Sequence, residues 1–143
     1  MLELKHIHKT FNPGTVNEKK ALRDLSLVLE DGDFATIVGS NGAGKSTMFN
    51  CIAGDFYPDE GDVVLDVTDL TYLPSHRRSR QIGRLFQDPM RGTAPHMTIG
   101  ENLALAYLRT AKHQSAFLSR VSRKDKDFFR DQLSRLDMGL EDR

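Results

Sequence analysis

The sequence is poor in the features that mark secreted, membrane-spanning or nucleic-acid-binding proteins. It has one cysteine in 143 residues, Cys51, so it cannot form an internal disulfide. No apolar run approaches the ~20 residues that cross a bilayer as a helix. Residues 1–11 alternate charged and apolar side chains and lack the continuous apolar stretch of a signal peptide. Twenty basic residues balance twenty acidic ones, which disfavours a general nucleic-acid binder. These absences predict a cytosolic chain, and 143 residues are about one domain in length.

Apolar residues alternate with polar ones in the first part of the chain, which predicts strands. Residues 2–7 indicate an opening strand, and the leucines of residues 25–29 share one face of a second strand, which ends at an Asp-Gly turn. The polar residues 11–20 between them are typical of a turn-rich loop. Residues 34–38 are apolar without alternation, which predicts a strand buried on both faces. Shorter strands are expected at 63–65 and 82–86.

Helix signals dominate the rest of the chain. Residues 45–53 predict a helix that ends at Gly54, with Pro58 beyond it. Capping boxes at 98–101 and 122–125 predict the N-termini of two further helices. We expect apolar stripes on these two helices to make core contacts. The stripes are Ile99, Leu103 and Tyr107 on the first, and Phe129, Leu133 and Leu136 on the second.

The stretch GSNGAGKST directly follows the apolar run 34–38. It fits the pattern G-x-x-x-x-G-K-[ST] with Gly39, Gly44, Lys45 and Ser46. Glycines bring backbone N–H groups close to a ligand, and the start of a helix adds free N–H groups and a favourable dipole for an anion. The alternative is a flexible glycine turn before a lysine, but the expected strand before and helix after are the context the motif requires. The loop therefore predicts a site for a nucleoside triphosphate.

The residue types of the loop predict separate roles. Lys45 would neutralise the β- and γ-phosphates, and the Ser46 hydroxyl would ligate Mg²⁺. The hydroxyl of Thr47 could reach the α-phosphate side. The predicted nucleotide-binding residues of the loop are Gly39, Ser40, Asn41, Gly42, Ala43, Gly44, Lys45, Ser46 and Thr47.

The loop alone does not select a class of nucleotide-binding protein. A GTPase would need a D-x-x-G switch and an N-K-x-D base-recognition motif, and neither occurs. A small-molecule kinase usually opens with its phosphate loop, whereas here 38 residues precede it.

Four stretches together resemble the ATP-binding subunit of ABC transporters. They are residues 29–47, 53–66, 80–89 and 97–106, in the family's order and near its spacing. The resemblance covers nearly the whole chain. It implies an α/β fold, a P-loop NTPase (ABC ATPase) core with an N-terminal antiparallel β region and the start of the helical subdomain. The corresponding divisions are residues 1–33, 34–90 and 91–143.

The resemblance also assigns two residues outside the loop. Gln87 falls at the Q-loop, which acts in catalysis with Lys45, helps to hold Mg²⁺ and senses the membrane partner. Phe11 falls at the aromatic residue that stacks on adenine; the alternative is that it is a core or loop residue. The implied cofactors are ATP and Mg²⁺.

Three parts of the family pattern do not occur: the L-S-G-G-Q signature, the Walker B strand that ends in Asp-Glu, and the switch histidine. Residues 63–66 resemble Walker B, but only three apolar residues precede Asp66, and Val67 stands where the catalytic Glu would be. We interpret this stretch as an ordinary strand end. We expect the chain to be a truncated, N-terminal part of a longer protein and not to hydrolyse ATP alone.

The resemblance implies an ATPase subunit that binds Mg·ATP and powers transport by transmembrane permease subunits. In the full-length form, a homodimer or heterodimer of ATPase subunits would hold two ATP molecules. Such a subunit is cytoplasmic and peripheral on the inner face of the membrane, with no nucleic-acid partner. Residues 88–109 are more similar to importer-type amino-acid ATPases than to drug exporters. A soluble ABC-type ATPase of DNA repair or translation, and a nucleotide-binding module without hydrolysis, stay open as alternatives.

Four weaker features have mainly structural interpretations. Cys51 is expected to be a small buried hydrophobe. The basic cluster at 76–80 is expected to be a solvated loop, with an anion site as the alternative. His6 and His8 would share one strand face, but a metal site would need a third ligand. Asp88-Pro89 is expected to begin a turn.

Overall fold

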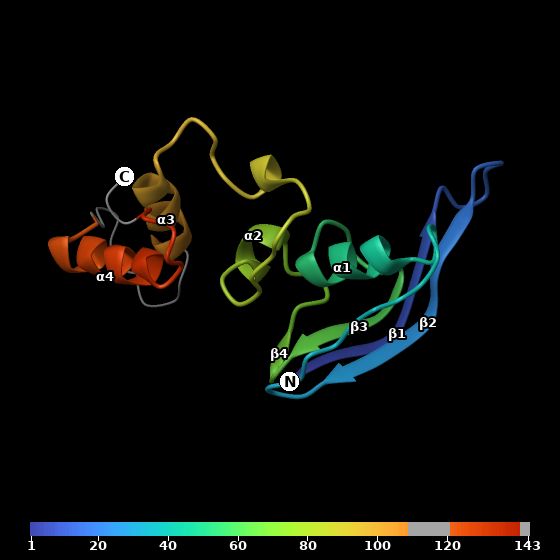
Figure 1. The fold of residues 1–143 in the computed structure, drawn as a ribbon. Helices are drawn as coiled ribbons and strands as arrows, with labels where there is room; N and C mark the ends of the chain where they lie inside the picture. Colours follow the sequence, from blue (N-terminus) through green and yellow to red (C-terminus); the bar gives the residue numbers. More distant parts are fainter. Residues whose placement is uncertain (109–120, 141–143) are drawn as a thin grey trace. The chain divides into compact units, whose positions relative to one another are not determined.

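The computed structural model describes residues 1–108 and 121–140 (Figure 1). The chain divides into two compact units, Met1–Ile82 and Gly83–Arg143. The predicted stripe residues and helix starts of the second part all lie within the described residues.

The first unit is built on a four-stranded antiparallel sheet with strand order β2-β1-β3-β4. Its strands are β1 (Leu2–Phe11), β2 (Lys19–Leu29), β3 (Glu60–Leu65) and β4 (Thr68–Asp69). Two helices belong to the same unit: α1 (Lys45–Ala53) and the short α2 (Ser75–Arg78). The expected strands at 2–7, 25–29 and 63–65 are thus confirmed, and the loop between β1 and β2 is shorter than expected because both strands extend into it.

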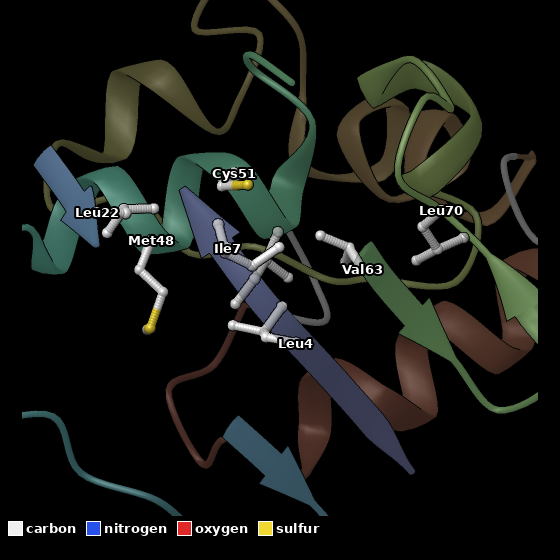
Figure 2. Close-up of a cluster of buried hydrophobic side chains, with 8 residues drawn as sticks. Leu4, Ile7, Leu22, Met48, Cys51, Val63 and Leu70 are labelled. Carbon is white, nitrogen blue, oxygen red and sulfur yellow. The ribbon is translucent and has the colours of Figure 1, made fainter. Parts of the chain in front are cut away.

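Apolar side chains join α1 to the sheet (Figure 2). Leu4, Ile7 and Val63 point from β1 and β3 toward the helix, which contributes Met48 and Cys51 (Figure 2). Ile7 and Val63 have no exposed surface. Cys51 is also buried, as predicted, and burial raises the pKa of its thiol. This layer of side chains fixes α1 against one face of the sheet.

The second unit contains a 3-10 helix η1 (Pro89–Arg91) and the helices α3 (Ile99–Leu108) and α4 (Arg123–Ser134). Both capping boxes are confirmed: the Glu101 N–H donates to Thr98 Oγ1 at 3.2 Å, and the Asp125 N–H donates to Ser122 Oγ at 3.2 Å. The Tyr107 ring packs edge-on against Phe129, with ring centroids 5.4 Å apart.

The two stripes contribute unequally to the packing of the second unit. No residue of α3 is buried, so the predicted core stripe Ile99, Leu103 and Tyr107 is only half-buried, whereas the stripe of α4 has a buried member. Phe129 is buried, whereas Leu136 is 57% exposed and follows the end of α4. Leu136 is therefore not the core residue that the stripe predicts, because the helical spacing ends before it.

The predictions of strands at 34–38 and 82–86 are wrong. Neither segment has regular secondary structure or strand pairing, and Phe34, Val38 and Leu85 are 95%, 88% and 100% exposed. A strand depends on hydrogen bonds to neighbouring strands. No strand among residues 1–108 and 121–140 pairs with either segment. Apolar composition alone therefore does not make these segments strands.

His6 and His8 do not form the shared strand face that alternation predicts. The β1 register shifts between Lys5 and His8, and His6 adopts a positive φ of 47°. Its Nδ1 lies 2.6 Å from Asp24 Oδ1. Within the described part of the chain, no group of three or more His, Cys, Asp or Glu residues could hold a metal ion.

Thr71 provides a buried polar contact in the first unit. Its side chain has no exposed surface, and its Oγ1 accepts a hydrogen bond from the Val63 N–H at 2.9 Å. The hydroxyl therefore satisfies a backbone donor of β3 where the short strand β4 has ended.

We expect Thr71→Val to lower the free energy of unfolding by about 1–3 kcal/mol, because the Val63 N–H would stay buried without an acceptor. Urea denaturation of the two proteins measures the difference. Thr71→Ser keeps the hydroxyl and is the matched control, with a smaller loss expected. Equal stability of Thr71→Val and wild type would contradict the role assigned to the hydroxyl.

Candidate nucleotide-binding site

The glycine loop forms a tight turn that leads directly into α1. The Ala43 N–H donates to the Ser40 carbonyl at 3.2 Å, and the Met48 N–H donates to the Gly44 carbonyl at 2.9 Å, which begins the helix. Gly44 has a φ of 91°, and a Cβ built there would lie 2.7 Å from the Ala21 carbonyl oxygen. Only glycine therefore fits where the loop touches β2.

The N-terminus of α1 has no side-chain cap. Its N-cap residue is Gly44, which makes no side-chain hydrogen bond, and no acidic residue occupies the first turn. The first N–H groups of a helix have no partner within the helix, and together they carry a partial positive charge. This end of α1 is therefore suited to an anionic ligand.

Lys45 folds back over the loop. Its Nζ donates to the carbonyls of Gly39 and Ser40 at 2.5 Å and 2.8 Å. The ammonium thus lies beside the backbone of the loop, while Ser46 is exposed at the first turn of α1. Amide and ammonium N–H groups are the donors that phosphate requires, and a hydroxyl oxygen is a suitable ligand for a hard divalent cation. The structure brings all nine predicted loop residues into one turn and helix start.

Phe11 lies at the end of β1, half-buried and paired with Lys19 of β2. Its ring packs at 85° against that of Phe56, with centroids 5.3 Å apart. Lys9 Nζ lies 5.8 Å from the centroid of the Phe11 ring. The contact with Phe56 is what the core-residue alternative predicts, and stacking on adenine stays a prediction.

Gln87 is exposed and lies in the second unit. The turn expected after it is confirmed: the Arg91 N–H donates to the Asp88 carbonyl at 3.1 Å, and the Met90 N–H donates to Asp88 Oδ1 at 3.0 Å. The phosphate loop belongs to the first unit, so the role of Gln87 in holding Mg²⁺ stays a prediction.

The basic cluster at 76–80 is only in part the solvated loop that its charge predicts: His76, Arg77 and Arg80 are exposed, but Arg78 is not. Residues 75–78 form α2, and Arg78 is only 1% exposed. Burial lowers the pKa of Arg78. Its hydrogen-bond acceptors are backbone carbonyls, which a single sequence does not show, so sequence reasoning had no signal for this residue.

The comparison with known proteins agrees with this geometry. A model of the ABC transporter family matches residues 22–143. The chain therefore belongs to the ABC transporter family. It is 44% identical over 107 residues to a tyrosine transport ATP-binding protein of Clostridioides difficile (strain R20291), covering 74% of this chain and 42% of the relative.

A more distant relative and a solved structure give the same assignment. The chain is 35% identical over 104 residues to a spermidine/putrescine import ATP-binding protein of Aggregatibacter actinomycetemcomitans, covering 73% of this chain and 26% of the relative. A dimeric ATP-binding cassette in a post-hydrolysis state, bound to ADP and Pi, has a TM-score of 0.71 and 28% identity. That match covers 94% of this chain and 57% of the cassette. The fold is thus the α/β fold of ABC ATPase cassettes, and the chain spans less than half the length of these curated relatives.

The residues that the structure describes contain no helix long and apolar enough to cross a membrane.

Asp59 holds the end of β1 that carries Phe11. Its Oδ1 accepts from Lys9 Nζ at 2.7 Å, and its Oδ2 accepts from the Thr10 N–H at 2.6 Å. Burial raises the pKa of Asp59, but the hydrogen bonds from Lys9 and Thr10 outweigh it, so the pKa is lowered below its usual value of 3.8. The carboxylate form therefore stabilises the fold.

We expect Asp59→Asn to lower the free energy of unfolding at pH 7 by less than about 1 kcal/mol. Asp59 is exposed, so solvent screens the charge of its carboxylate. Because the pKa of Asp59 is lowered in the folded state, its carboxylate stabilises the fold at pH values above the unfolded-state pKa near 3.8. This stabilisation is lost as the pH falls through the lower folded-state pKa. The difference in free energy of unfolding between variant and wild type should therefore disappear below about pH 4. Denaturation at several pH values, with the exposed Asp62→Asn as control, measures it. A difference independent of pH would contradict the assignment.

Proposed function

We propose that this chain is the ATP-binding part of an ABC transporter ATPase subunit, and that its phosphate loop binds Mg·ATP. The observation that carries the proposal is the turn at 39–44, which delivers backbone amides and the Lys45 ammonium to the uncapped start of α1. The names of its relatives, which describe ATP-binding proteins of transport systems, support the same function.

The residues of the loop would divide the work of binding. The amides of the loop and of the first turn of α1 would hold the phosphate oxygens, and Lys45 would move from the Gly39 and Ser40 carbonyls to the β- and γ-phosphates. Ser46 would ligate Mg²⁺, with Gln87 as a second ligand, and Thr47 would contact the α-phosphate side. Bound Mg²⁺ supplies charge neutralisation between the phosphates.

Hydrolysis, transport and assembly are proposed for a protein of the full length of its relatives. Phosphoryl transfer needs a residue that orients the attacking water, and these 143 residues contain no Walker B strand ending in Asp-Glu and no L-S-G-G-Q signature. We therefore propose that the chain binds ATP but does not turn it over alone. In the full-length form, a dimer of ATPase subunits on the inner face of the membrane would act on permease subunits.

Lys45→Ala tests the binding site directly. The ammonium offers charge-assisted hydrogen bonds worth about 1.5–3 kcal/mol each, so the variant should bind Mg·ATP at least about tenfold more weakly. Isothermal titration of the 143-residue chain measures the affinity. Lys124→Ala removes an exposed lysine of α4 and should bind as wild type does. Equal Mg·ATP affinities of Lys45→Ala and wild type would contradict the assignment of residues 39–47 as a phosphate-binding loop.

Phe11→Ala tests the base-stacking role. Stacking uses the face of the ring and is worth roughly 1–3 kcal/mol per base. The variant should therefore bind both ATP and GTP more weakly than wild type does. Phe11→Tyr keeps the ring and should be nearly neutral for both nucleotides. If Phe11→Ala binds ATP normally but unfolds more easily, Phe11 is a packing partner of Phe56 only.

A further inference from the structure

Arg78 is a buried cation held by backbone carbonyls. Its Nε donates to the Leu73 carbonyl at 2.7 Å and its Nη2 to the Thr71 carbonyl at 2.9 Å. Its Nη1 donates to the carbonyls of Cys51 and Ile52 at 2.7 Å and 2.9 Å. The guanidinium therefore joins the last turn of α1 to the segment that follows β4.

The environment of Arg78 suits the C-terminus of a helix. Within the described residues, no carboxylate lies within ion-pair distance of the guanidinium, so carbonyls alone accept its hydrogen bonds. The last carbonyls of a helix lack partners within the helix and carry a partial negative charge. Arg78 donates to two of the last carbonyls of α1, those of Cys51, which also accepts from the Gly54 N–H, and of Ile52. Its charge thus lies where the dipole of α1 favours a cation.

Gly54 lets the guanidinium approach this closely. It caps α1 with a φ of 82°, and a Cβ built there would lie 2.8 Å from Arg78 Nε. The end of α1 and the arginine are thus in direct contact, with no room for another side chain between them.

The opposite end of α1 carries the phosphate loop. The helix has nine residues, about 13 Å at 1.5 Å per residue, and is too short to bend appreciably. Gly44 rests on Ala21 at the N-terminal end, and Met48 and Cys51 are buried against the sheet. A shift of the C-terminal end would therefore tilt the helix about its packed middle and move its first turn.

We propose that Arg78 is a positioning residue for the phosphate loop: it fixes the C-terminus of α1 and thereby sets where Lys45 and Ser46 meet the nucleotide phosphates. This role rests on the proposed function of the loop. Arg78 itself touches no phosphate in this assignment. It acts through the helix.

The test compares Arg78→Ala and Arg78→Lys with Arg77→Ala, which removes an exposed arginine of the same helix α2. Mg·ATP affinity is measured by isothermal titration well below the thermal midpoint of each protein. Adenosine affinity and the amide chemical shifts of Gly44 and Lys45 are measured by NMR. Lysine keeps the charge but has only three donors on a compact ammonium. It therefore cannot make the four hydrogen bonds that the planar guanidinium of Arg78 makes.

We expect Arg78→Lys to bind Mg·ATP about tenfold more weakly, since small misplacements of binding groups carry large penalties. Adenosine affinity should stay within about twofold of wild type, because adenosine makes no phosphate contact. The Gly44 and Lys45 amides should shift although they lie at the far end of α1. Arg77→Ala should match wild type in every measurement. If Arg78→Ala does not fold, Arg78→Lys carries the test.

Two results would overturn the proposal. One is wild-type Mg·ATP affinity in Arg78→Lys with unmoved Gly44 and Lys45 amides. The other is an equal loss of Mg·ATP and adenosine affinity, which would show general loss of structure. If wild type itself fails to bind Mg·ATP, the proposed function falls, and the amide shifts alone then decide whether Arg78 positions the loop.

Discussion

The contact between α1 and the antiparallel sheet is the constraint on which the first unit depends. The helix buries Met48 and Cys51 against Leu4, Ile7 and Val63, and the last two of these are entirely removed from solvent. Nonpolar surface buried in this way contributes roughly 25 cal/mol per Å². Because the phosphate loop is continuous with the helix, the packing that stabilises the fold also sets the direction in which the loop amides point.

Local sequence signals predicted the elements whose causes are themselves local. Alternation predicted parts of β1 and β2, Gly54 predicted the end of α1, and the two capping boxes predicted the starts of α3 and α4. The phosphate loop was predictable for the same reason: its glycines, lysine and hydroxyls lie within nine consecutive residues. In each case the residues that determine the conformation are close together in the chain.

The failures involve partners that lie far away in the chain or are part of the backbone. Residues 34–38 have the composition of a buried strand, yet strand formation needs neighbours to pair with, and composition cannot supply them. The burial of Arg78 depends on carbonyls that every residue possesses, so no sequence pattern marks them. His6 lies at a register shift that alternation does not anticipate. The contact of Phe11 with Phe56, 45 residues further along the chain, is likewise not visible in a motif, while stacking of Phe11 on adenine stays a prediction.

The carbonyl acceptors of Arg78 have a consequence for sequence divergence. A buried arginine that pairs with a carboxylate is lost when either partner mutates, so the two positions must change together. Here the partners are main-chain atoms of Cys51, Ile52, Thr71 and Leu73, whose side chains can be replaced without removing an acceptor. The hydrogen bonds that link α1 to the segment after β4 through Arg78 therefore depend on one side chain alone, together with a glycine at position 54 that leaves it room.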